Sequence, residues 1–205
     1  MKIHSLYDGG YGSVCYLAVS NSGDEAVLID PSASYEQALA SWGTLPRIKA
    51  LLLTHAHFDH ILCVDEWREK TGAPLCVCAE DACMLTDPSL SCYRMFFGRD
   101  TVHGAADVIL KDGEMIAFGE ESLRVFKTPG HTAGSCVYAG DGVLFTGDTV
   151  FARGGYGRCD LPSGSLRQLF ESIRRIFHSF PEQYVIYPGH GGTSTLAEER
   201  PYYSV

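Results

Sequence analysis

The most informative segment of the chain is Thr54-His55-Ala56-His57-Phe58-Asp59-His60, which contains three imidazoles and one carboxylate within six residues. Imidazole nitrogen and carboxylate oxygen together suit first-row divalent metals, and catalytic zinc sites use such ligands in preference to four thiolates. His55 and His57 point the same way if the segment leaves a strand, because alternate residues of an extended chain share a face. Asp59 and His60 begin the next turn and can face a neighbouring ion. The segment therefore predicts a site for one or two metal ions.

Three further residues, His131, Asp148 and His190, share one local setting. Each directly follows a glycine, and a short apolar run stands just before it. Residues at the ends of adjacent strands converge on one edge of a sheet, and glycine permits the close backbone approach that a metal centre requires. We therefore expect seven candidate ligands: His55, His57, Asp59, His60, His131, Asp148 and His190. The other histidines lack this context and are expected at the surface or in packing: His4, His103 and His178.

Length and composition indicate one globular domain. The chain has 205 residues and a mass of 22.4 kDa, and one domain typically holds about 100 to 200 residues, so we expect a single domain over residues 1–205. A chain of this length buries roughly 70% of the surface of its unfolded form and needs no disulfide or structural metal to fold. Hydrophobic residues make up 45% and charged residues 20%, as in ordinary soluble proteins. A bound metal would therefore serve chemistry.

Charge and targeting signals narrow the expected partners and compartment. The 25 acidic and 16 basic residues give a formal net charge of -9, which opposes binding to nucleic acid or to an anionic membrane. The N-terminus has no long apolar stretch typical of a secretory signal, and no window approaches the 18 apolar residues of a spanning helix. We expect a cytoplasmic protein with a small-molecule substrate and with no nucleic-acid or membrane partner. The pattern leaves the oligomeric state unknown.

Short apolar runs broken by Gly, Pro, Asp and Ser, with amphipathic segments between them, indicate an α/β protein. Several runs are apolar throughout, as expected for strands that are covered on both faces. In both halves of the chain such a run is followed by His or Asp, which fits two sheets packed face to face. The expected strands are 14–19, 26–30, 47–54, 74–79, 123–128, 136–138, 143–146 and 184–187.

Four helices are expected from apolar periodicity and capping residues. The clearest opens at Ser165, with Gln168 as its capping-box partner, and carries one apolar stripe: Leu166, Leu169, Phe170, Ile173, Ile176 and Phe177. Capping residues and terminal glycines place the others: one from Ser34 to Gly43, one over about 59–70 before Gly72, and one starting at Thr195 and Glu198. Residues 81–106 are polar and rich in turn formers, so we expect an irregular insertion beside the sheet.

The order His-x-His-x-Asp-His, Gly-His-Thr, Gly-Asp and Gly-His resembles the metallo-β-lactamase fold superfamily of metal-dependent hydrolases, nearly from end to end. Four further motifs resemble its short bacterial glyoxalase II-like (hydroxyacylglutathione hydrolase-like) branch: 12–17, 29–31, 157–164 and 189–193. The resemblance implies an αββα sandwich of two mixed β-sheets flanked by helices. It also implies a dinuclear metal site along one edge of the sheets.

By motif position, the resemblance implies a specific division of the ligands. The first metal takes His55, His57 and His131, the second takes Asp59, His60 and His190, and Asp148 bridges the two. We expect two divalent ions, with zinc as the first choice and iron or manganese as alternatives, because His and Asp accept several divalent metals.

The implied chemistry is attack by a metal-bridging hydroxide on a carbonyl. Water bound to such a metal ionises near neutral pH, its pKa falling from 15.7 to about 7, so no Ser or Cys nucleophile is required. Asp59 and Asp148 are the expected catalytic residues, because their carboxylates can accept hydrogen bonds from the bound water and hold it in line. A thiolate is a good leaving group that needs little general acid.

The leading expectation is therefore hydrolysis of a thioester such as S-lactoylglutathione or a related hydroxyacyl thiol conjugate. Full-length glyoxalase II proteins carry a C-terminal helical extension that contacts glutathione, and this sequence ends at Val205, 15 residues after His190. The resemblance consequently leaves the thiol unnamed. Candidates for substrate contact are Tyr156, Arg158, Tyr187 and Arg200, with an exposed loop or local ion pair as the alternative for each.

Other functions on the same fold remain open at this point. A mononuclear iron persulfide dioxygenase uses a subset of the same ligands, and a lactonase or other ester hydrolase uses the same chemistry. The net charge of -9 argues against an RNA-processing nuclease. Asp148 stands where the common zinc β-lactamases have Cys, and His57 stands where the flavodiiron proteins have Glu. A non-catalytic scaffold leaves all seven ligands unexplained.

The eight cysteines lie mostly in apolar runs, where reduced thiols behave as small hydrophobes, so we expect no disulfides. The spacing of Cys76, Cys78, Cys83 and Cys92 matches no common zinc knuckle. Cys63 follows the metal-binding segment and is expected to pack into the core.

Overall fold

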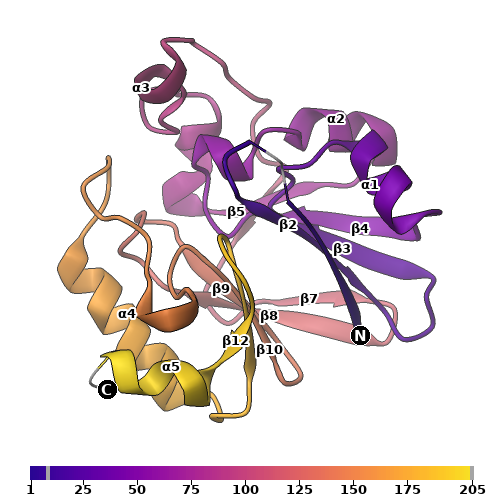
Figure 1. Ribbon diagram of the computed structural model, residues 1–205. Coiled ribbons are helices and arrows are strands. Elements are labelled where there is room, and N and C mark those ends of the chain that lie inside the picture. Colours follow the sequence, from indigo (N-terminus) through magenta and orange to yellow (C-terminus); the bar gives the residue numbers. More distant parts are fainter. Residues whose placement is uncertain (8–9, 204–205) are drawn as a thin grey trace.

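The structure is a computed structural model that describes residues 1–7 and 10–203. Two six-stranded sheets pack face to face, and helices cover their outer faces (Figure 1). The first sheet contains, in spatial order, β1 (Lys2–Tyr7), β2 (Val14–Val19), β3 (Glu25–Ile29), β4 (Arg47–Leu52), β5 (Leu75–Cys78) and β6 (Val108–Leu110). The second contains β12 (Ser194–Thr195), β11 (Val185–Pro188), β10 (Val143–Gly147), β9 (Cys136–Gly140), β8 (Glu121–Lys127) and β7 (Met115–Phe118).

Both sheets are mixed. In the first, β1, β2 and β3 are antiparallel neighbours, whereas β3 to β6 run parallel. In the second, β10 and β11 are parallel and the remaining neighbours are antiparallel. Helices α1 (Tyr35–Trp42) and α2 (Val64–Thr71) lie on the first sheet, and α4 (Leu166–Ser179) and α5 (Leu196–Tyr203) lie on the second (Figure 1). The expected αββα sandwich is confirmed.

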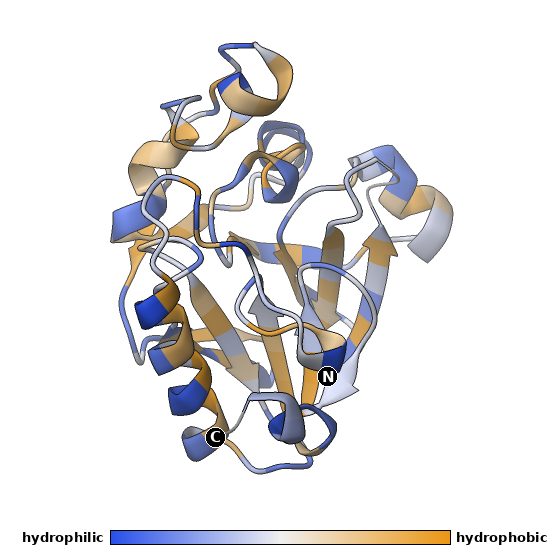
Figure 2. Ribbon diagram, turned by 60° about the vertical axis from the view of Figure 1, so that its left-hand side comes forward, coloured by the Kyte–Doolittle hydropathy of each residue, from blue (hydrophilic) through white to orange (hydrophobic). Residues whose placement is uncertain are grey.

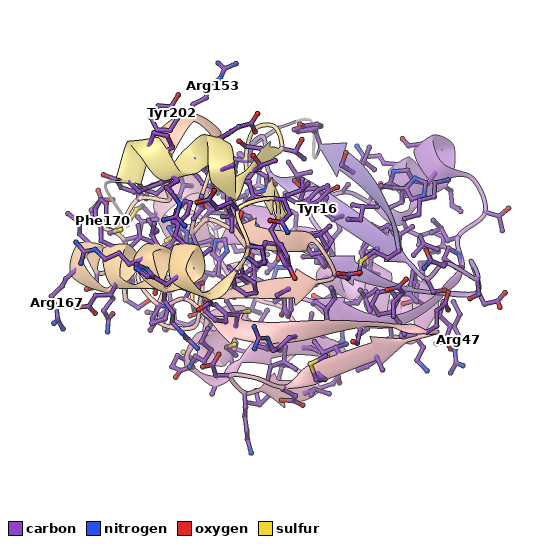
Figure 3. The ribbon with its side chains drawn as sticks, turned by 90° about the horizontal axis from the view of Figure 1, so that it is seen from below. Tyr16, Arg47, Arg153, Arg167, Phe170 and Tyr202 are labelled. Atoms are coloured by element: carbon purple, nitrogen blue, oxygen red, sulfur yellow. The ribbon has the colours of Figure 1, made fainter. Side chains whose placement is uncertain are left out.

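Strand β2 shows why some strands are apolar throughout. Cys15 and Leu17 pack in the core beneath the helices of the first sheet, whereas Tyr16 and Ala18 pack in the core between the sheets. Figure 3 places Tyr16 in this central layer. Because successive side chains of a strand point to opposite faces, a strand buried on both faces needs apolar residues at every position. Hydrophilic residues accordingly gather on the outer faces of the covering helices (Figure 2).

The eight expected strands are all present, and the four that sequence patterns missed are the sheet edges. These are β1 and β6 in the first sheet and β7 and β12 in the second. An edge strand is paired on one side only and is partly exposed. Strand β1 mixes polar and apolar residues and β12 is Ser-Thr, whereas β6 and β7 are apolar but only three and four residues long. Neither mixed sequences nor such short runs stand out as strands in the chain.

The helix ends follow the predicted capping residues, with two corrections. The capping box expected at Ser165 is only half formed, because the N–H of Ser165 donates to the carbonyl of Gly130 at 2.7 Å and not to Gln168. Ser34 and Ser165 each accept a hydrogen bond from the backbone three residues on, and Gly72 ends α2 in a left-handed conformation. The helix expected over about 59–70 begins only at Val64. A single 3₁₀ turn, η1 (Phe58–His60), precedes it, because the backbone N–H groups of residues 58 and 63 donate to carbonyls of Ser91 and Pro31 outside the helix.

The segment 81–106 is more ordered than expected. It contains most of the 3₁₀ helix η2 (Ala79–Leu85) and the short helix α3 (Tyr93–Phe97), which stands apart from the sheets in Figure 1. Leu85 and Tyr93 pack into the core beside the first sheet. Within the described ranges, none of the helices combines the length and apolar character that crossing a membrane requires.

Candidate metal centre

The seven predicted ligands meet at one end of the sandwich. They lie in the segments that follow β4, β8, β10 and β11. Because the ends of these strands lie at one edge of the sandwich, the His and Asp residues that follow them are brought together there. The two sheets are joined at this edge, where the N–H of Val14 donates to the carbonyl of Gly189 at 2.9 Å. The site is therefore built across both sheets.

The first group of ligand atoms consists of three buried imidazoles, His55, His57 and His131, whose nitrogens all lie within 4.8 Å of one another. His131 Nε2 is 2.8 Å from His57 Nδ1 and 3.1 Å from His55 Nε2. Such short separations between nitrogens of three rings place their lone pairs around a common point. This is the grouping that the family resemblance implied for one metal.

The second group consists of Asp59, His60 and His190, again within 4.8 Å. Asp59 Oδ2 lies 3.1 Å from His190 Nε2 and 3.7 Å from His60 Nε2. Asp148 stands between the two groups. Its Oδ1 is 3.4 Å from His60 Nε2, and its Oδ2 is 3.5 Å from His131 Nε2 and 3.7 Å from His190 Nε2. One carboxylate thus reaches both groups.

The candidate ligands have the unpaired polar atoms expected of a cation-binding site. Three buried atoms of candidate ligands, His57 Nε2, His60 Nε2 and Asp148 Oδ1, have no hydrogen-bond partner among the described residues, as is also true of Ser32 Oγ outside the ligand set. Buried polar atoms are otherwise almost always paired, because leaving one unpaired costs free energy. His60 Nε2 and Asp148 Oδ1 face each other at 3.4 Å among the candidate ligand atoms, and nitrogen and oxygen donors suit zinc, iron or manganese. The residues therefore fit a divalent ion in each group.

The two groups differ in charge. Burial, reinforced by the neighbouring His131, lowers the pKa of His57 to about 3, and burial likewise holds the pKa of His55 well below its usual value. Burial acts in the same direction on His60, but the carboxylates of Asp59 and Asp148 outweigh it and raise the pKa of His60 well above 6.5. His55 and His57 are therefore neutral and ready to ligate, whereas His60 must lose a proton first.

His190 and Asp148 follow the same electrostatics. Burial alone lowers the pKa of His190, but its hydrogen bond with Asp59 raises that pKa overall. Burial alone raises the pKa of Asp148, yet the positive charge of His60 holds it below the usual value. Asp148 is therefore a carboxylate at neutral pH.

Asp30 orients His60, a role that the sequence analysis did not assign. Its buried carboxylate accepts hydrogen bonds from the N–H and hydroxyl of Thr54, both at 2.7 Å, and its Oδ2 lies 2.9 Å from His60 Nδ1. A carboxylate on one ring nitrogen fixes the orientation of the ring, so that the other nitrogen faces the metal position. The signal was present, because Asp30 directly follows a buried strand as Asp148 does.

Asp81 joins the two loops that carry the first group. It is fully buried, and its carboxylate accepts hydrogen bonds from Ala56 N–H at 3.2 Å and from Gly134 N–H and Thr132 Oγ1 at 2.7 Å each. Ala56 lies between two ligands, and Thr132 follows a third. Asp81 was missed because it sits in the polar insertion, where a buried carboxylate has no local signature.

Glycines allow the close approach that the sequence analysis expected. A Cβ atom at Gly189 would overlap the carboxylate of Asp148 and the ring of His60. A Cβ atom at Gly157 would overlap the backbone of Asp148 and the ring of His131. The loop around Gly157 also holds His131 in place, because the backbone carbonyl of Arg158 lies 2.7 Å from its Nδ1.

A cavity of about 320 Å³ opens onto the ligand groups. Its floor contains five of the candidate ligands: His57, Asp59, His131, Asp148 and His190. Its walls are Tyr11, Phe58, Cys92, Phe96, Phe151, Gly157, Arg158 and Leu161. Of the four candidates for substrate contact, Arg158 lines this cavity. The other three pack elsewhere: Tyr156 against Phe170, Tyr187 against Tyr16, and Arg200 beside Glu182.

The remaining predicted residues lie away from the ligand groups. His103 pairs with Asp65 at 2.8 Å, and His4 packs near Trp42. None of the eight cysteines forms a disulfide, and Cys76 and Cys78 pack between the sheets.

The profile of the Metallo-beta-lactamase superfamily matches residues 8–190. The chain belongs to this superfamily. It is similar to the crystal structure of the BLEG-1 B3 metallo-beta-lactamase, with 32% identity and a TM-score of 0.89 over 98% of this chain and 97% of that one. It is also similar to TTHA1623 in a di-iron-bound form, with 32% identity and a TM-score of 0.80 over 97% of this chain and 96% of that one.

A further relative is the probable polyketide biosynthesis zinc-dependent hydrolase BaeB of Bacillus velezensis. It is 31% identical, over 92% of this chain and 78% of its own length. The chain is accordingly a metal-dependent hydrolase of the metallo-β-lactamase superfamily, with a candidate His and Asp cluster for divalent metal. Zinc in one relative and iron in another leave the metal open.

Proposed function

We propose that this metallo-β-lactamase superfamily member hydrolyses the thioester of a small hydroxyacyl or related acyl group. The observation that carries the proposal is the convergence of seven ligands in two groups, with Asp148 between them, on the floor of a cavity. A cavity of about 320 Å³ falls within the range of roughly 300–1,000 Å³ that is typical of small-molecule sites. A small molecule is therefore the proposed substrate.

We further propose that His55, His57 and His131 hold one divalent ion and that Asp59, His60 and His190 hold a second, with Asp148 as a ligand to both. Zinc is the proposed metal, and iron or manganese would be held by the same atoms. Divalent ions bound there would bring the pKa of water near neutrality and polarise a carbonyl group.

The protein's own groups support this chemistry in three ways. Asp148, ionised and with its Oδ1 unpaired, and Asp59 provide carboxylate oxygens that accept a proton or a hydrogen bond from water at the floor of the cavity. Phe58 and Phe151 line the wall beside them and exclude bulk water. Burial raises the pKa of the nearby Cys92 thiol, which favours water over this cysteine as the nucleophile.

The test is hydrolysis of S-D-lactoylglutathione by zinc-loaded protein, followed as loss of thioester absorbance. The control is His57→Ala, which removes one imidazole from the first group. Thioester loss by the wild type that disappears in the variant supports the proposal. A wild-type protein that binds two zinc ions and leaves every tested thioester intact overturns it.

β-Lactam hydrolysis is a second candidate, favoured by the likeness to the BLEG-1 B3 metallo-beta-lactamase. A chromogenic cephalosporin tests it with the same zinc-loaded protein and the same variant. The single-iron persulfide dioxygenase stays an alternative, because the atoms of one ligand group alone would hold an iron ion. Oxygen uptake by iron-loaded protein in the presence of a persulfide would support it.

We also propose a cytoplasmic location. The support is that none of the eight cysteines forms a disulfide and that five of them lie buried in the interior cores, as in proteins of reducing compartments.

A further inference from the structure

Part of the cavity wall beside the ligand groups is aromatic. Tyr11 comes from the segment before β2, Phe58 lies between two candidate ligands, and Phe96 comes from helix α3. The rings of Tyr11 and Phe58 meet edge to face with centroids 5.2 Å apart, and those of Phe58 and Phe96 are 5.0 Å apart. Three segments distant in sequence thus build one continuous apolar surface beside the metal site.

This surface is partly open to solvent. Phe58 is 7% exposed, but Tyr11 and Phe96 are 48% and 49% exposed, and both line the cavity. Exposed aromatic rings clustered at a cavity mark a surface that gains free energy when an apolar group covers it. The covering group is part of the substrate, because the same cavity has five candidate ligands as its floor.

The charged side chains of the cavity disfavour a covering group that carries negative charge. Apart from imidazoles, Arg158 is the single cationic side chain among the described residues that line the cavity. Its Nε and one terminal nitrogen already donate to the carboxylate of Asp160, at 2.7 Å each. A substrate with several carboxylates would therefore meet one guanidinium that is already paired with Asp160. It would also be repelled by the carboxylates of Asp59 and Asp148 that line the same cavity.

We propose that Tyr11, Phe58 and Phe96 bind an uncharged apolar or aromatic group next to the scissile bond, so that the substrates are apolar thioesters. The inference rests on the thioester hydrolysis proposed above and narrows its substrate class. The apolar group belongs either to the acyl half or to the thiol half of the substrate. An apolar group on either half would make the same contacts with the wall, and experiment distinguishes the two possibilities.

Two series of thioesters provide the test with zinc-loaded protein. One series varies the acyl group on N-acetylcysteamine, from acetyl through butanoyl and hexanoyl to phenylacetyl. The other keeps the acetyl group and varies the thiol from N-acetylcysteamine to phenylmethanethiol. We expect kcat/KM to rise about tenfold or more along one series, mainly through KM, since one buried methylene typically discriminates by roughly 10-fold or more. The series that rises identifies the half that contacts the wall.

Phe96→Ala and Met95→Ala form a matched pair on α3. Both residues are largely exposed, at 49% and 62%, but Phe96 alone lines the cavity. We expect Phe96→Ala to flatten the rising series and Met95→Ala to leave it unchanged. Thermal unfolding of both variants checks that each is folded. Identical profiles for the two variants, or equal kcat/KM along both series, overturn the inference.

A direct binding measurement separates this inference from the proposed function. Ketone analogues, in which a CH₂ group stands between the carbonyl and the sulfur, are not hydrolysed, and calorimetry reports their affinities. If no thioester is hydrolysed, the proposed function fails, but the wall still requires tighter binding of either the phenylacetyl-type or the phenylmethylthio-type analogue than of the analogue with acetyl and N-acetylcysteamine-type halves. Loss of that preference in Phe96→Ala supports the inference, and equal affinities for all three analogues contradict it.

Discussion

Removal of the Asp81 carboxylate is predicted to loosen the two loops that carry the first ligand group. In Asp81→Ala, the buried N–H groups of Ala56 and Gly134 lose their acceptor, whereas the hydroxyl of Thr132 keeps Ser135 Oγ at 2.7 Å. An orphaned buried donor costs about 1–3 kcal/mol, so two cost about 2–6 kcal/mol. Burial raises the pKa of Asp81, which indicates that removing this carboxylate recovers part of its desolvation cost.

We therefore expect a loss of about 3 kcal/mol, which is a large share of the 5–15 kcal/mol typical of a domain. Urea unfolding of metal-free protein measures this loss directly. We also expect zinc affinity to fall by about tenfold or more, as when hydrogen bonds that orient metal ligands are removed. A competing chelator dye measures the affinity.

Asp100→Ala is the control, because it removes an acid from the same insertion. Asp100 forms an exposed ion pair with Arg94, and such pairs contribute at most about 1 kcal/mol. Unfolding midpoints and zinc affinities that are equal for Asp81→Ala and Asp100→Ala would refute the argument that Asp81 holds the two loops together.

Three further perturbations test the site. Zinc binding at pH 7 should release protons, because the pKa values of His60 and His190 are raised in the metal-free protein, and the apparent zinc affinity should fall as the pH is lowered. Calorimetry in buffers of different ionisation enthalpy measures the proton release, and proton uptake would contradict the prediction. Gly189→Ala should destabilise the protein by about 1–3 kcal/mol, because the added Cβ overlaps the candidate ligands Asp148 and His60. Gly192→Ala is the control, since a Cβ at that position meets open space. Equal melting temperatures of the two variants would contradict the close approach of Gly189 to the ligands. Asp30→Asn should weaken zinc binding about 10–100-fold by releasing the His60 ring, and an unchanged affinity in chelator competition would exclude that role.

The central strands and the principal helices were predictable from the chain because their signals are local. Strand β2 is apolar at all six positions, and Ser34 begins α1 with its capping box. The edge strands β1 and β6 were not predictable, since β1 mixes polar and apolar residues and β6 is only three residues long, and the pairing of both depends on the assembled sheet. The late start of α2 depends on carbonyls of distant residues, which no local pattern records.

The identity of the candidate ligands could be read from the chain alone. Ligand chemistry is a property of the side chain, and a glycine before His131 or Asp148 at a strand end is a local signal. The residues that orient those ligands were hidden, because their partners are remote in sequence. Asp81 bonds to Ala56 across 25 positions and to Gly134 across 53.

The family resemblance implied how the ligands are divided, but only the tertiary structure showed the distances between them and what faces them. His57 and His131 are 74 positions apart, yet their ring nitrogens lie 2.8 Å from each other, and the aromatic wall is assembled from three separate segments. Side-chain chemistry and hydrophobic periodicity are local properties of the sequence, whereas distances between loops depend on the packing of the two sheets. The sequence therefore specified the fold class, the chemistry of the site and, through the family resemblance, the grouping of the ligands, whereas packing set the distances between them and assembled the apolar surface beside them.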